Sequence, residues 1–257
     1  MPYEDSLATK TRIMTKLTEF DSLFEKPEAK SEVETVKDSG GRTKIMVAIP
    51  HLGWILAGLE TKIARWIMER DYDVVQLFRS AAPVSANRNG IVHEFLQTDC
   101  DFLLMIDSDT TPIKNPLDLV KHDKDIVSGA TPTWKEGGYA WAVGRRYEDG
   151  SYNQYKQDER TGLRLVDGVG ASCLMIKRKV LETVKIPFME KWNEIGERAL
   201  GEDLHFCEKA QEAGFEVWCD WGTMCNHAKE VPMLAIIETV MKTWDRGVKQ
   251  GKLDKRN

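Results

Sequence analysis

Four short apolar runs, separated by segments with helical spacing, constrain the fold of this chain more than any other feature of its sequence. The runs are KIMVAIP at 44–50, DVVQLF at 73–78, DFLLMI at 101–106 and DIVSGA at 125–130. Helices are expected between them, near residues 56–69, 88–97 and 116–122. A continuous apolar run such as 44–50 is typical of a strand covered on both faces. The alternation of strands and helices therefore predicts an α/β fold, with an open, mostly parallel, Rossmann-like sheet flanked by helices.

The second half of the sequence follows a less regular pattern. Residues 137–155 are rich in glycine and aromatic residues, which indicates short antiparallel strands and a loop near a ligand. The elements expected after it are a turn, strand and helix start at 170–182, a helix at 201–214 and a strand at 215–228. The helix is expected to take Asp203 as its N-cap and to end before Gly214, and the strand is expected to end near His227.

The main α/β domain is predicted to span 44–229, between two terminal segments. Residues 1–43 are expected to form an amphipathic helix and a charged connector, and residues 230–257 a C-terminal amphipathic helix with a basic tail. The C-terminal helix carries an apolar face from Met233 to Trp244, which needs to pack on the domain, a second subunit or a membrane surface. Packing on the domain is the simplest expectation, and a homo-oligomer formed through the terminal helices stays open.

Charge and cysteine content exclude some classes of protein. The 257 residues include 36 Lys and Arg against 41 Asp and Glu, and a net charge of -5 argues against a general binder of nucleic-acid backbones. The five cysteines form no CxxC pair, which favours free thiols in a reducing compartment over a disulfide framework. The N-terminal residues are not apolar, and no run approaches the ~20 apolar residues of a membrane span. A cytoplasmic protein without a transmembrane segment is therefore expected.

Two aspartates, Asp107 and Asp109, directly follow the buried run 101–106, with Ser108 between them. Ligands of open α/β sheets bind at the carboxyl ends of the strands, so both carboxylates are expected in that crevice. Two neighbouring carboxylates repel each other unless a cation or several hydrogen bonds compensate. Mg²⁺ and Mn²⁺ prefer such oxygen ligands together with substrate phosphates, which predicts a metal–diphosphate site. The alternative is that Asp109 caps a turn and Asp107 is solvated.

Three further side chains are candidates for the same site. His227 is the best candidate for a third metal ligand, although a histidine at a strand end is as often a structural hydrogen-bonding group. Glu202 and Asp203 follow a glycine at a predicted helix start, where a carboxylate either stabilises the helix or acts as a general base. A zinc site that includes Cys219, Cys225 and His227 lacks a second pair of soft ligands, so it is disfavoured.

The order of these motifs resembles that of glycosyltransferases of the GT-A fold. The matching pieces are KIMVAIP, ANRNGIVHEFLQTDCDFLLMIDSD, DGVGASCLMIKRKVLE, GEDLHFCEKAQEAGFEVWCD and NHA, over about residues 44–228. The most specific pieces are the DxD motif at the end of a strand and the GED helix. The resemblance implies a GT-A catalytic domain and a hexosyltransferase that uses a nucleotide-sugar donor.

The resemblance also implies roles for individual residues. Asp107, Asp109 and His227 would hold Mn²⁺ or Mg²⁺ against the donor diphosphate, next to Ser108. Donor contacts are implied for Pro50 and His51, near the base, and for Arg88 and Asn89, near the nucleotide and the sugar. Asp203 matches the general base of inverting members, with Glu202 beside it for substrate hydroxyls.

Other functions remain open on the sequence alone. DSDTT also fits the DxDxT motif of haloacid-dehalogenase-like phosphatases, although that motif normally ends the first strand of its domain. A non-catalytic nucleotide-sugar-binding module is a further alternative, which retention of the GED carboxylates disfavours. Residues 77–89 lack the aspartate-rich turn that many GT-A enzymes place against the base, so the nucleotide is not identified. The acceptor is equally open: a glycan, a protein, a lipid-linked sugar or a modified nucleobase.

Overall fold

The structure is a computed structural model that describes residues 41–135, 138–229, 234, 236–238, 240–242 and 244. The last positions, from 234 onwards, are helical. The predicted N-terminal helix lies outside the described residues, as does most of the 230–257 segment, so the two terminal segments stay predictions. In the part of the chain that the structure describes, no helix is both long and apolar enough to cross a membrane.

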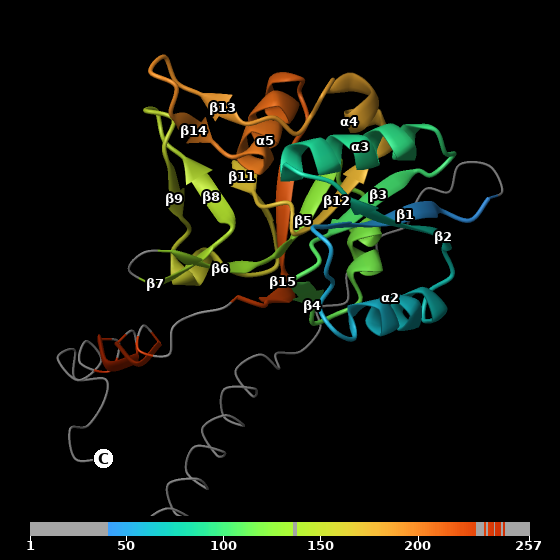
Figure 1. The fold of residues 1–257 in the computed structure, drawn as a ribbon, viewed down its shortest axis with the longest axis horizontal. Coiled ribbons are helices and arrows are strands. Elements are labelled where there is room, and N and C mark those ends of the chain that lie inside the picture. Colours follow the sequence, from blue (N-terminus) through green and yellow to red (C-terminus); the bar gives the residue numbers. More distant parts are fainter. Residues whose placement is uncertain are drawn as a thin grey trace, which may run out of the picture. The chain divides into compact units, whose positions relative to one another are not determined.

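An eight-stranded sheet forms the centre of the domain (Figure 1). In spatial order its strands are β10 (Leu163–Leu165), β15 (Val217–His227), β5 (Ile126–Ala130), β12 (Cys173–Lys177), β3 (Phe102–Ile106), β1 (Lys44–His51) and β2 (Asp73–Ser80), with β4 (Thr110–Pro112) paired to β15. Strands β1, β2, β3, β5 and β15 share one direction, and β4, β10 and β12 run the opposite way. The predicted open, mostly parallel sheet with a smaller antiparallel part is confirmed.

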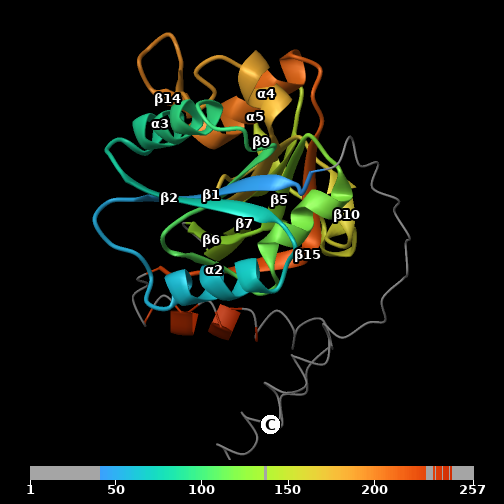
Figure 2. The same cartoon turned by 90° about the vertical axis from the view of Figure 1, so that its right-hand side faces the viewer.

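Helices cover both faces of this sheet, which explains why its central strands β1, β3, β5 and β12 are largely buried (Figures 1 and 2). Along β1, Met46 and Ala48 belong to the core on one face, and Val47 and Ile49 to the core on the other. The first core includes residues of α3 (Val84–Leu96), α4 (Arg178–Thr183) and α5 (Glu202–Glu212), and the second includes residues of α2 (Leu59–Met68) and the 3₁₀ helix η1 (Pro116–His122).

Short strands make up the less regular second half, as its glycine and aromatic content predicts. They are β6 (Pro132–Lys135) with β7 (Gly138–Trp141), β8 (Val143–Arg146) with β9 (Tyr152–Gln154) and β11 (Gly168–Val169), and β13 (Lys191–Trp192) with β14 (Arg198–Leu200); the 3₁₀ helix η2 (Gln157–Glu159) follows β9. A Cβ atom on Gly144 or Gly168 would come within 2.8 Å of the Tyr152 ring. These two glycines therefore let the ring lie flat against the small sheet.

One local expectation needs correction. Asp203 is not the N-cap of its helix: the cap is Gly201, in extended conformation, and Glu202 and Asp203 are the first residues of α5. The carboxylate of Asp203 is thus free to face outward from the first turn instead of closing it. Strand β2 forms an edge of the sheet and is partly exposed, with Val75 and Phe78 open to solvent, because it has a neighbour on one side only.

Candidate active site

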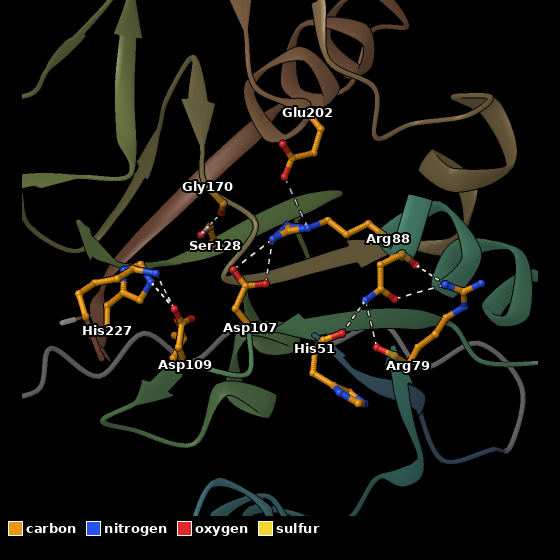
Figure 3. Close-up of polar contacts among 12 residues, drawn as sticks. His51, Arg79, Arg88, Asp107, Asp109, Ser128, Gly170, Glu202 and His227 are labelled. Atoms are coloured by element: carbon orange, nitrogen blue, oxygen red, sulfur yellow. Dashed lines mark hydrogen bonds and ion pairs between the residues drawn. The ribbon is translucent and has the colours of Figure 1, made fainter. Parts of the chain in front are cut away.

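The turn after β3 brings both aspartates of the DSD motif to the carboxyl end of the sheet. The amide of Asp107 donates to the Ser172 carbonyl at 3.0 Å, and the Thr110 amide donates back to the Asp107 carbonyl at 2.9 Å. The chain then continues as β4, which pairs antiparallel with the end of β15 so that Thr110 faces His227. Close pairing of β4 with β15 therefore sets Asp109 beside His227, although the two are far apart in the sequence (Figure 3).

A bulge in β15 makes that pairing possible. The strand pairs with β5 up to Asp220, shifts register, and pairs again at Met224 before it reaches β4. The carboxylate of Asp220 stabilises the bulge: it accepts hydrogen bonds from the Gly222 amide at 2.8 Å and the Thr223 hydroxyl at 2.7 Å. The backbone of the bulge passes over Gly129, where a Cβ atom would come 2.6 Å from the Thr223 carbonyl oxygen. The bulge thus directs the last residues of β15 into the site.

Asp107 pairs with a buried arginine of α3. Nη2 of Arg88 lies 2.8 and 3.1 Å from the two carboxylate oxygens of Asp107, and Nε lies 3.7 Å from Glu202 Oε1 on α5 (Figure 3). Burial alone would lower the pKa of Arg88, but the charges of Asp107, Glu202 and Asp203 raise it, so the guanidinium stays charged. Burial also raises the pKa of Glu202.

Arg88 has hydrogen-bonding capacity left over. The side chain is 5% exposed, and its Nε and Nη1 have no hydrogen-bond partner among the described residues. A buried donor without a partner is costly, and Arg88 also borders a cavity, so its guanidinium is a candidate contact for a bound ligand.

Asp109 pairs with a histidine and a lysine at once. Its Oδ2 lies 3.2 Å from His227 Nε2 and 2.5 Å from Lys229 Nζ. Burial would raise the pKa of Asp109, but these two partners outweigh it and lower the pKa to about 2. The hydrogen bond with Asp109 in turn raises the pKa of His227. Both carboxylates of the motif are therefore paired, which overturns the alternative of a turn cap beside a solvated aspartate.

The orientation of His227 suits a metal ligand. Its Nδ1 lies 2.8 Å from the Pro132 carbonyl oxygen, which accepts only, so Nδ1 carries a proton. In the neutral ring Nε2 then directs a lone pair at a carboxylate oxygen, an arrangement that needs a cation or a second proton between them. Asp109 and His227 thus fit a divalent ion that takes its remaining ligands from substrate and water.

Asp107 does not join them, because its oxygens face Arg88 (Figure 3). Within 41–135 and 138–229, no group of three or more His, Cys, Asp or Glu side chains is arranged to hold a metal. In the alternative zinc site that the sequence disfavours, Cys225 lies against Cys173 and Thr131. The assignment of Asp107, Asp109 and His227 together as metal ligands stays a prediction.

A cavity of about 320 Å³ joins these groups to the second half of the chain. Its lining includes Arg88, Asp107, Trp141, Tyr152, Asp203 and His227. Asp203 contributes from the first turn of α5, and its Oδ1 accepts a hydrogen bond from the Leu204 amide at 2.8 Å. The cavity therefore combines a fixed guanidinium, the imidazole of His227 with Asp109 beside it, an oriented carboxylate and two aromatic side chains, which suits a polar ligand with an anionic part.

The remaining predicted residues lie outside this lining. Asn89 is occupied in structure, since its amide exchanges hydrogen bonds with the main chain of Phe188 at 2.6 and 3.0 Å. Pro50 is buried in β1, and the His51 carbonyl accepts from Asn87 Nδ2 at 3.3 Å. Ser108 acts through its carbonyl, which accepts from the Leu56 amide at 2.8 Å and so fixes the loop after β1.

Sequence reasoning missed Asn87 and Lys229. Asn87 is buried in α3 and links β1 to β2 through the carbonyls of His51 and Arg79. Lys229 could have been found from strand periodicity, because a residue two positions after His227 lies on the same side of an extended chain. No comparable pattern identifies Asn87.

Comparisons with known proteins bear on the fold. Neither a protein-family description nor a curated protein matches the sequence. The crystal structure of A197 from STIV aligns with a TM-score of 0.52 and 21% identity over 73% of this chain and 87% of that chain. The crystal structure of GalNAc-T7 with UDP, GalNAc and Mn²⁺ aligns with a TM-score of 0.49 and 10% identity over 76% of this chain and 45% of that chain. The likeness to A197 shows a shared fold, and the architecture is consistent with the Rossmann-like GT-A type that the sequence predicts.

Proposed function

We propose that this chain is a metal-dependent glycosyltransferase of the GT-A type, which moves a sugar from a nucleoside-diphosphate sugar to an acceptor hydroxyl. One observation carries the proposal: His227, Arg88 and the first-turn Asp203 meet around one cavity at the carboxyl end of the sheet, with Asp109 beside His227. These are the groups that a diphosphate leaving group and an attacking hydroxyl need, on opposite sides of the transferred sugar.

In this proposal Asp109 and His227 hold the Mn²⁺ or Mg²⁺ ion, with Asp107 in support. When bound, the ion neutralises charge that develops on the leaving nucleoside diphosphate. The Arg88 guanidinium interacts with oxygens of the donor from the cavity wall, while Asp107 and Glu202 keep it in place. Because the guanidinium is already oriented and desolvated, its interaction with donor oxygens needs little reorganisation.

Asp203 is the proposed general base. Its Oδ1 accepts from the Leu204 amide, which leaves Oδ2 for the acceptor hydroxyl. In an inverting reaction that oxygen takes the hydroxyl proton as the acceptor attacks the anomeric carbon. In a retaining reaction it orients substrate only. The transferred sugar, the nucleotide and the acceptor are left open.

The first test is thermal unfolding of the full chain with UDP, GDP, ADP or CMP, each with Mn²⁺ or with EDTA, for wild type and Asp109→Ala. A ligand at 100 times its Kd stabilises by about 2.7 kcal/mol. One nucleotide is expected to raise the melting temperature only with metal and only when Asp109 is present. Failure of every nucleotide at saturating concentration contradicts the proposal and directs attention to the phosphatase alternative, which predicts hydrolysis of an aryl phosphate that depends on Asp107.

A further inference from the structure

Lys229 stands in the candidate metal site although no part of the proposed reaction uses it. The ladder between β4 and β15 continues past His227, where the Ala228 amide donates to the Asp109 carbonyl at 2.8 Å. Side chains alternate along an extended chain. His227 and Lys229, the residues before and after Ala228, therefore project from the same face of the chain. Both reach the same oxygen, Asp109 Oδ2.

Charge favours the ammonium in this position. The Asp109 side chain is only 15% exposed, and an unpaired carboxylate there would be costly. His227 has Nδ1 committed to the Pro132 carbonyl, so its neutral form offers Asp109 no proton. Lys229 is the full positive charge within hydrogen-bonding distance of Oδ2, and its side chain is 45% exposed on a flexible stem.

An ammonium and a divalent ion cannot both take this position. Each binds the same lone pairs of Asp109 Oδ2, and two cations in contact repel each other. In contrast to the Lys229 ammonium, the Arg88 guanidinium is fixed in place, because it is buried and held from two sides by Asp107 and Glu202.

We propose that Lys229 is an internal counter-cation, whose ammonium occupies the cation position at Asp109 until a divalent ion displaces it. This inference rests on the metal site of the proposed function. The lysine keeps Asp109 paired without metal, and it weakens metal binding by competing for Oδ2. Metal binding therefore exchanges one cation for another instead of filling an empty site.

The experiment measures binding of Mn²⁺ alone, by electron paramagnetic resonance of the free ion, to the full chain without nucleotide. Lys229→Met keeps the aliphatic stem and removes the charge, so it is expected to bind Mn²⁺ about tenfold more tightly than wild type, a change that corresponds to about 1.4 kcal/mol. Lys229→Arg keeps a competing charge and should stay within about threefold of wild type. Asp109→Ala should lose the site.

Lys121→Met is the matched control. Lys121 also pairs with an aspartate, Asp118, at 2.8 Å and is also more than one third exposed, but it lies in η1. This variant should bind Mn²⁺ as wild type does. Melting temperatures of all variants confirm that each is folded.

Equal affinity of wild type and Lys229→Met overturns the inference and leaves the metal site intact. Weaker binding by Lys229→Met also overturns it, since the ammonium then assists the site. Absence of Mn²⁺ binding in every variant overturns it as well. Release of nucleotide from a nucleotide-sugar in EDTA is measured separately, so a transferase that works without metal remains distinguishable from a chain without transferase activity.

Discussion

At the scale of single residues, position in the fold separates two adjacent carboxylates that the sequence presents as a pair. Glu202 is buried against Arg88, whereas Asp203 lines the cavity and keeps one oxygen free of main-chain hydrogen bonds. A buried carboxylate paired with arginine maintains structure, and a cavity-lining carboxylate can exchange protons with a ligand. The two residues should therefore respond differently to substitution.

We predict that Asp203→Asn abolishes transfer and leaves donor binding intact. The amide keeps the shape of the side chain and its acceptor for the Leu204 amide, but it cannot take a proton. Loss of a general base lowers kcat by about 10²- to 10⁴-fold. The measurement compares turnover with the nucleotide-dependent rise in melting temperature. Unchanged turnover contradicts the assignment, and a folded wild type that binds donor without any turnover would identify a binding module.

Residue roles were predictable only where they depend on local sequence. The DSD motif and the GED helix start stand out because each places carboxylates directly after a strand or a glycine. Their partners were harder to predict: Arg88 holds Asp107 and Glu202 through contacts across the fold, and Asn89 turned out to bind the main chain of Phe188. One-dimensional spacing carries no information on which distant backbone a polar side chain meets.

At the scale of elements, the bulge in β15 decides whether His227 reaches Asp109. If β15 continued along β5 without the register shift, its last residues would not pair with β4. Sequence periodicity predicted the strand and its end but not the register shift after Asp220, because a bulge changes pairing without changing the apolar pattern. The bulge imposes one local requirement: position 129 needs a glycine, because a Cβ atom there would meet the backbone of the bulge.

We predict that Gly129→Ala lowers stability and weakens Mn²⁺ binding together. The added Cβ would meet the Thr223 carbonyl oxygen at 2.6 Å and the thiols of Cys173 and Cys225 at 3.2 and 3.3 Å. Crowding of this kind in a core costs about 1–3 kcal/mol, and its relief needs the bulge to move. Chemical denaturation measures the first effect and titration with Mn²⁺ the second.

Gly41→Ala provides the control, because a Cβ at Gly41 has no atom within 4 Å. Its stability should match wild type within about 0.5 kcal/mol. Normal Mn²⁺ affinity in a destabilised Gly129→Ala protein would show that the bulge does not position His227.

At the scale of the whole domain, the site is assembled from both halves of the chain. The regular first half supplies Arg88 and Asp107 to the cavity and Asp109 beside it, and the less regular second half supplies Asp203, His227 and the aromatic lining. Apolar runs predicted the sheet well, because strands buried on both faces have no polar positions to obscure them. The relative placement of the two halves depends on long-range strand pairing, which those runs do not encode.

Arg88 links three elements that are distant in the sequence, so its removal tests that assembly. Arg88→Met leaves Asp107 and Glu202 without their shared partner, and loss of one member of a buried ionic group costs about 3–5 kcal/mol. The variant should therefore melt well below wild type. Addition of Glu202→Gln removes one of the two unpaired charges and should recover part of the loss, because residues in contact are energetically coupled.

Denaturation of wild type, both single variants and the double variant completes a thermodynamic cycle. A double variant whose loss equals the sum of the two single losses would mean that Arg88 and Glu202 act independently. The double variant should still fail to bind nucleotide, because methionine cannot replace the guanidinium that Arg88 contributes to the cavity lining. Recovered stability without recovered binding would separate the structural contribution of Arg88 from its contribution to the ligand.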